Sequence, residues 1–138
     1  MGYIERHRVA LPASVSGGAT QGFFTSRAVA GFVEAIRYTR ATASALSTVA
    51  GLVITGERSG IVILDATATG DGRTWYPHGQ AEDVSGIGLG FTSAATPPLV
   101  PRKIPVANER IKVEVASAGT ASTVFSSGNF LDLYISGF

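Results

Sequence analysis

The sequence predicts an all-β fold, an antiparallel β-sandwich of about eight short strands, and three observations support this. Small residues are abundant, since Gly, Ala, Ser and Thr supply 62 of the 138 residues. Apolar and polar residues alternate over short stretches, which is the period of a half-buried strand. Gly and Pro separate these stretches, and Glu, Lys, Gln and Met are scarce. We expect one domain over residues 1–138, with a jelly-roll-like arrangement of strands.

The first half of the chain contains five stretches with the strand pattern. They span residues 3–11, 20–26, 28–39, 51–56 and 60–68. In the first stretch Tyr3, His7, Val9 and Leu11 share one face, and Arg6 and Arg8 lie on the other. Gly31 is expected to mark a β-bulge. Residues 40–50 read as an irregular connection.

The second half begins with a strong turn signal, Gly70-Asp71-Gly72. It predicts a hairpin that joins the strand at 60–68 to a strand at 73–78. Residues 86–90 alternate glycine with apolar residues, which indicates a strand with one bare face. Prolines at 97, 98 and 101 then interrupt any sheet. The last two expected strands are 110–116, with Ile111, Val113 and Val115 inward, and 130–135.

Composition excludes several classes of function. The chain has no cysteine, which excludes a disulfide scaffold, a thiolate zinc site and a cysteine nucleophile. No apolar run approaches the roughly 20 residues that span a bilayer, so no membrane partner is expected. The basic residues are scattered, which argues against nucleic acid. Only 15% of residues are charged and the net charge is +1, which favours a subunit of an assembly over a free monomer.

No pattern predicts a catalytic residue, a cofactor or a metal. The glycines at 86–90 lack the spacing and the following helix of a phosphate-binding loop. His7 and His78 have no second ligand at a suitable spacing. The serines lie in turns without a nucleophile elbow. Sparse acidic residues at strand ends are expected to be turn caps or ion-pair partners.

Two groups of residues are candidates for binding. Trp75 and Tyr76 lie side by side in an expected strand, where they would serve as core, as interface anchors or as a stacking platform for sugar rings. Arg6, His7 and Arg8 would contact an acidic partner surface or protect a sheet edge. Arg102 and Lys103 form a second basic pair.

Three stretches resemble a known class of proteins. They are Phe32-Val33-Glu34-Ala35-Ile36-Arg37-Tyr38, then the run Leu-Val-Ile-Thr-Gly-Glu-Arg-Ser-Gly at 52–60, then Val-Ala-Asn-Glu-Arg-Ile-Lys-Val at 106–113. In this order they resemble small tailed-bacteriophage virion proteins of the head decoration (cement) or minor capsid type. The resemblance runs from about Gly31 to the closing strand and rests on strand sequences. It departs at 117–129, where this chain has a longer segment rich in Ser, Ala and Thr.

The resemblance implies a structural protein without enzymatic activity. Such a protein self-associates, often as a homotrimer, and stabilises the head by bridging subunits of the major capsid protein. It is made in the bacterial host cytoplasm and resides on the capsid surface of the virion. It stabilises the shell by binding the assembled form better than free subunits. The residues expected at such contacts are Tyr3, Arg6, Arg8, Trp75, Tyr76, Arg102 and Phe138. The alternative is a carbohydrate-binding β-sandwich of a tail or fibre that uses Trp75 and Tyr76.

Overall fold

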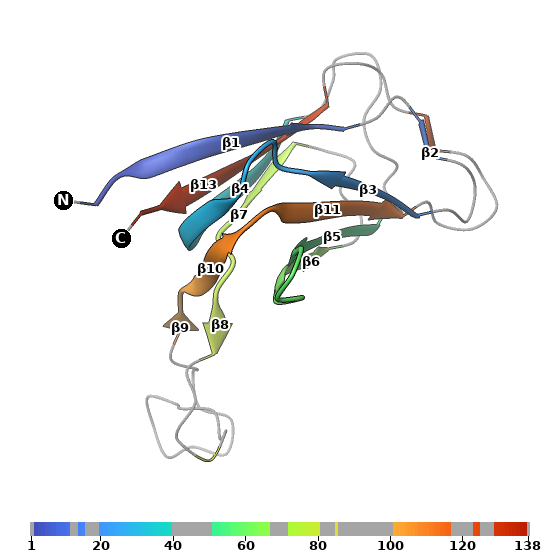
Figure 1. Cartoon of the computed structure of the whole chain (residues 1–138). Coiled ribbons are helices and arrows are strands. Elements are labelled where there is room, and N and C mark those ends of the chain that lie inside the picture. The colour runs from blue at the N-terminus through green and yellow to red at the C-terminus, as the bar shows by residue number, and fades with distance from the viewer. Residues whose placement is uncertain are drawn as a thin grey trace.

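The computed structural model of the chain describes residues 2–11, 14–15, 20–39, 51–66, 72–80, 85, 101–116, 123–124 and 129–137. Within these ranges all regular secondary structure is β-strand, and no helix is present. A five-stranded and a four-stranded antiparallel sheet lie against each other, and the two chain ends lie side by side (Figure 1). The prediction of an all-β sandwich is therefore confirmed.

The two sheets contain most of the strands. The five-stranded sheet has the order β1 (Ile4–Ala10), β13 (Phe130–Ser136), β4 (Val29–Thr39) and β10 (Ile104–Glu109), with β7 (Arg73–Trp75) also paired to β4. The four-stranded sheet has the order β3 (Thr20–Phe24), β11 (Ile111–Ala116), β5 (Gly51–Gly56) and β6 (Val62–Ala66). Two short pairs complete the description: β2 (Ser14–Val15) with β12 (Thr123–Val124), and β8 (Gly79–Gln80) with β9 (Pro101–Arg102).

The pairing is nested in the manner of a long hairpin wrapped around itself. β1 pairs with β13, β3 with β11, β4 with β10, and β5 with β6. Two further pairings, β13 with β4 and β11 with β5, join these ladders into the two sheets. This nesting is the strand order of a jelly roll.

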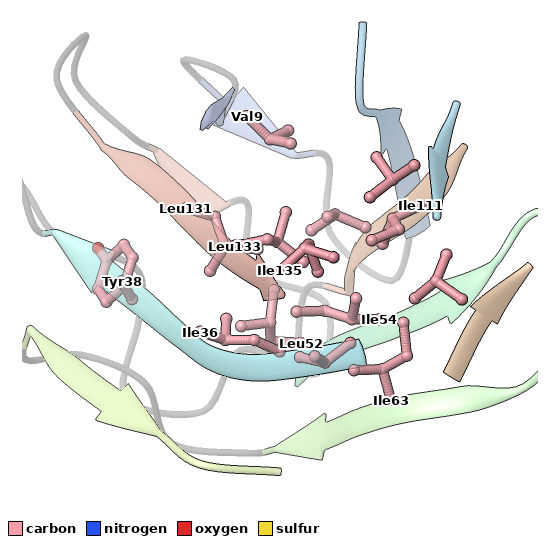
Figure 2. Close-up of a cluster of buried hydrophobic side chains, with 14 of the residues drawn as sticks. Val9, Ile36, Tyr38, Leu52, Ile54, Ile63, Ile111, Leu131, Leu133 and Ile135 are labelled. Carbon is pink, nitrogen blue, oxygen red and sulfur yellow. The ribbon is translucent and has the colours of Figure 1, made fainter. Parts of the chain in front are cut away.

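The core fills the space between the sheets (Figure 2). Alternate residues of the facing strands point inward, as the two-residue period of a strand requires. Eight of the inward hydrophobic residues have no exposed surface: Ile36, Leu52, Ile54, Ile111, Val113, Val115, Leu131 and Leu133. The predicted inward face of 110–116 is thereby confirmed. In β13 the inward residues are Leu131, Leu133 and Ile135.

Two of the connections that carry the chain from one sheet to the other lie entirely within the described residues. β3 passes into β4 through residues 25–28, and β10 passes into β11 at Arg110 (Figure 1). Thr25 ties the two connections together, because its Oγ1 accepts the amide of Ile111 at 3.1 Å and donates to the carbonyl of Arg27 at 2.8 Å. Asn108 lies in the left-handed region, with φ 53°, where the register of β10 on β4 shifts.

The expected bulge at Gly31 is wrong. Gly31 pairs directly with Val106, and the extra residue of β4 opposite β13 is Glu34. Glycine is needed at position 31 for another reason: its φ is 142°, and the carbonyl of Ser136 approaches its backbone closely.

The predicted hairpin between residues 60–68 and 73–78 is also wrong. β6 belongs to the four-stranded sheet and pairs with β5, whereas β7 joins the five-stranded sheet beside β4. Packing decides this, because the pairing places Trp75 beside the buried Ile36, against the core.

The sequence analysis did not predict β10. Pro105 lies within it, and a proline is tolerated there because β10 is an end strand of the sheet. The expectations for residues 40–50 and 86–90, and for the turn residues 70 and 71, fall outside the described residues.

Candidate protein-binding surface

The solvent-facing side of the five-stranded sheet gathers polar and aromatic side chains in register. Across β1, β13, β4 and β7, one row consists of Arg8, Asp132, Arg37 and Thr74. The next row places Tyr134 between Arg6 and Ala35. Below, "outer face" means the surface formed by Ile4, Arg6, Arg8, Arg37, Tyr76, Asp132 and Tyr134.

Asp132 is the electrostatic centre of the outer face. Arg8 donates from Nε to Oδ1 at 2.8 Å and from Nη2 to Oδ2 at 2.9 Å. The side chain of Asp132 is almost completely covered although it lies outside the core, at 4% exposure. The Arg8 guanidinium also lies 4.7 Å from the centroid of the Phe130 ring. The bidentate pair thus fixes one arginine flat over the sheet.

Three positive charges surround this single carboxylate. The hydrogen bonds from Arg8 lower the pKa of Asp132, and the charges of Arg8, Arg6 and Arg37 lower it further. Arg6 and Arg37 form no ion pair with any side chain in the described part of the chain. The outer face therefore has a formal charge of about +2 within a chain whose net charge is +1.

Replacing Asp132 by asparagine is expected to lower the free energy of unfolding at neutral pH by about 1–2 kcal/mol, because the charge-assisted pair is lost. The folded pKa of Asp132 lies below its ordinary 3.8, so its contribution is complete at neutral pH and disappears as the pH falls through the folded pKa. Urea unfolding at neutral pH and near pH 2.5 should show the difference between wild type and Asp132→Asn shrinking in acid. An equal difference at both pH values would contradict the assignment.

Tyr76 stands between two shallow hollows of the surface. Its side chain is 71% exposed. The first hollow, of about 460 Å³, is lined by Ile4, Glu34, Ala35, Arg37, Thr74, Tyr76 and Tyr134. The second, of about 450 Å³, is lined by Val33, Glu34, Tyr76, Pro77, His78, Pro101, Arg102 and Lys103. The tyrosine ring and the apolar Ile4 thus lie among basic side chains.

Glu34 separates the two hollows and is held in place. It accepts from Lys103 Nζ at 2.6 Å and from Ser136 Oγ at 2.6 Å. These hydrogen bonds lower its pKa, that of Lys103 having the larger effect. Lys103 thereby neutralises the bulge residue of β4, whereas Arg102 forms no ion pair with the side chains that the structure describes.

The structure brings together some of the predicted contact residues. Arg6, Arg8 and Tyr76 share the outer face, and Arg102 lies across the second hollow from Tyr76. Tyr3, immediately before β1, is 55% exposed and lies beside Gly137. Phe138 lies outside the described residues.

Trp75 and Tyr76 do not form one platform. Adjacent residues of a strand point to opposite sides. The ring of Trp75 packs against the core and is partly buried, with the Arg73 guanidinium 5.5 Å from its centroid. Of these two residues, only Tyr76 is exposed.

Sequence analysis did not identify four of the seven residues of the outer face. Arg37, Tyr134, Ile4 and Asp132 were not singled out, although each has the outward parity of its strand. The sequence shows which residues of each strand point to the same side. It does not show the pairing register that brings residues of different strands together.

These observations define a jelly-roll domain with a basic, aromatic outer face. No protein-family model matches the chain, and no curated protein matches it. A search of solved structures finds a crystal structure of FLHE, with a TM-score of 0.49 and 8% sequence identity, over 97% of this chain and 96% of that one. A similarity at that level does not bear on function. Among the described residues no helix is long and apolar enough to cross a membrane. No group of three or more potential metal ligands forms within the same residues.

Proposed function

We propose that the chain is a structural virion protein without enzymatic activity: a capsid decoration protein of a tailed bacteriophage that bridges subunits of the major capsid protein. The observation that supports this best is the outer face. It presents Ile4, Tyr76 and Tyr134 among three arginines on a rigid sheet. Tyrosine and arginine are enriched at protein interfaces and dominate their binding energy.

The charge of the outer face indicates the chemistry of the partner. Three arginines facing one aspartate favour a contact surface with an excess of carboxylates. The resemblance of residues 32–38, 52–60 and 106–113 to decoration proteins supplies the class of partner. The first of these stretches lies within β4, which contributes Arg37 to the outer face. Self-association as a trimer, with a position on the capsid surface, belongs to the same proposal.

The test is co-sedimentation of the purified chain with heads of the phage whose genome encodes it. Wild type is expected to bind the heads, and light scattering is expected to give a trimer. Arg37→Glu, which reverses a charge on the outer face, is expected to weaken binding by about tenfold or more, equal to ~1.4 kcal/mol.

The matched control is Arg58→Glu, the same charge reversal in the exposed turn after β5. It is expected to bind heads like wild type. No binding by wild type overturns the proposed function. Equal binding by both variants overturns the outer face as the contact surface.

The carbohydrate-binding alternative rests on fewer groups. Only Tyr76 of the predicted pair presents an exposed ring, because Trp75 packs against the core. Specific glycan binding that disappears in Tyr76→Ala would favour this alternative over the decoration protein.

A further inference from the structure

We propose that the free edge of β1 takes up an extended acidic segment of a partner protein as an additional strand. Strand addition supplies affinity through main-chain hydrogen bonds and specificity through alternate side chains. This inference goes beyond the proposed function, since it holds whatever class of protein supplies the segment.

β1 offers an unusually regular edge. It is an end strand of the five-stranded sheet and, among the described strands, pairs with β13 alone. Its seven residues keep one continuous register from Ile4 to Ala10, without a bulge or a proline. Sheet edges are commonly protected by such interruptions. The opposite end strand, β10, has both, with Pro105 in the strand and a register shift at Asn108.

The direction of the free hydrogen-bonding groups follows from the ladder to β13. The amide of Gly137 donates to the carbonyl of Tyr3 at 2.9 Å, and the amide of Leu11 donates to the carbonyl of Asn129 at 3.0 Å. Backbone groups of successive residues in an antiparallel strand point alternately to its two sides. The odd-numbered residues of β1 therefore face β13. The amides and carbonyls at positions 4, 6, 8 and 10 face the free edge.

The same even-numbered residues determine the chemistry of the added strand. Their side chains, Ile4, Arg6, Arg8 and Ala10, lie on the outward side of the sheet. Residues of the added strand that point outward would lie beside Arg6 and Arg8. Opposite charges on neighbouring strands stabilise the pairing. Because Arg6 has no ion pair among the described side chains, a carboxylate there would compensate an unneutralised charge.

A second copy of the chain is a poor occupant of this edge. Two β1 strands related by a two-fold axis keep matching faces only when residues of equal parity meet. Every such register with at least five paired residues places Arg6 against Arg6, Arg6 against Arg8, or Arg8 against Arg8. Like charges directly opposite each other destabilise a strand pair. The free edge of β1 therefore disfavours pairing with β1 of a second copy and favours an acidic segment.

The probe is a fluorescently labelled heptapeptide, Thr-Glu-Val-Glu-Val-Glu-Thr, with blocked ends. Its glutamates would lie beside the arginines, and its valines would lie on the inner side, next to His7 and Val9. Fluorescence anisotropy at low salt is expected to show binding at least tenfold tighter than that of the same peptide with lysine for glutamate. Amide chemical-shift changes are expected over 4–10.

Substitutions at Arg6 separate strand addition from general charge attraction. Arg6→Pro and Arg6→Ala lose the same charge, but only the proline also loses an amide, one that faces away from β13, so the β1–β13 ladder is retained in both. Peptide binding is expected to be at least tenfold weaker in Arg6→Pro than in Arg6→Ala, and equal binding would show charge attraction alone. Arg6→Glu retains the amide and is expected to reduce or reverse the preference for the acidic peptide. If the proline variant does not fold, amide shift changes confined to 4–10 distinguish strand addition from charge attraction.

Three results would overturn the inference: equal binding of the two peptides, shift changes outside β1, or dimerisation through β1 in solution. A chain that ignores phage heads but binds the acidic peptide as described would overturn the proposed function and leave this inference standing.

Discussion

Replacing Gly31 by alanine is expected to lower the free energy of unfolding by about 2–6 kcal/mol, which would remove much of the ~5–15 kcal/mol typical of a domain. Gly31 is buried in β4 between β13 and β10, with φ 142°. A Cβ there would overlap the carbonyl oxygen of Ser136 and lie 3.1 Å from Cγ2 of Ile135. Backbone strain and overpacking therefore act together, and neither neighbour is a flexible side-chain end.

Gly60→Ala is the matched control for the Gly31 variant. Gly60 also has positive φ, 68°, but no atom lies within 4 Å of an added Cβ. Gly60→Ala is expected to lower the free energy of unfolding through backbone strain alone, by about 1–2 kcal/mol. Urea unfolding monitored by circular dichroism measures both variants. If Gly31→Ala were no less stable than Gly60→Ala, the close approach of Ser136 would not exist.

Most strands could be predicted because the alternation of apolar and polar residues is a local property of the sequence. In β11, the pattern Ile111, Val113 and Val115 requires only a two-residue period and an apolar interior. The hairpin at 60–78 failed for the opposite reason. A Gly-Asp-Gly turn indicates a reversal of the chain, but the sheet that the next strand joins depends on what Trp75 packs against.

The outer face depends on register between distant segments. Arg8 and Asp132 are 124 positions apart, and their ion pair arises because β1 lies beside β13. Sequence analysis could place Arg6 and Arg8 on one face of a strand, and it did. It could not identify Asp132 as their common partner or bring Arg37 beside it, because nothing local sets the alignment of β13 with β4.

A buried carboxylate at the junction of the sheets was likewise expected only as a cap or an ion-pair partner. Glu109 is 4% exposed at the end of β10. Its Oε2 accepts the amide of Arg58 at 2.6 Å and the amide of Ser59 at 2.8 Å. It therefore caps the turn between β5 and β6 from the strand that passes between the two sheets. Glu109 is therefore a turn cap, one of the two roles expected for it. It also links the β5–β6 turn to the connection between the two sheets.

Glu109→Ala is expected to lower the free energy of unfolding at neutral pH by about 2–3 kcal/mol, because two backbone amides lose a charged acceptor. The hydrogen bond from the Ser59 side chain lowers the pKa of Glu109 most, and the amides of Ser59 and Arg58 lower it further. Since the folded pKa lies below the ordinary 4.5, this stabilisation is complete at neutral pH and is lost as the pH falls through the folded pKa.

The control for Glu109→Ala is Glu57→Ala, in the same turn. Glu57 pairs with Arg110 at the surface, where solvent weakens an ion pair, so a much smaller loss is expected. Hydrogen exchange gives an independent readout: the amides of Arg58 and Ser59 should exchange faster in Glu109→Ala and remain protected in Glu57→Ala. Equal losses of stability in the two variants, with unchanged exchange at Ser59, would show that the turn does not depend on the buried carboxylate.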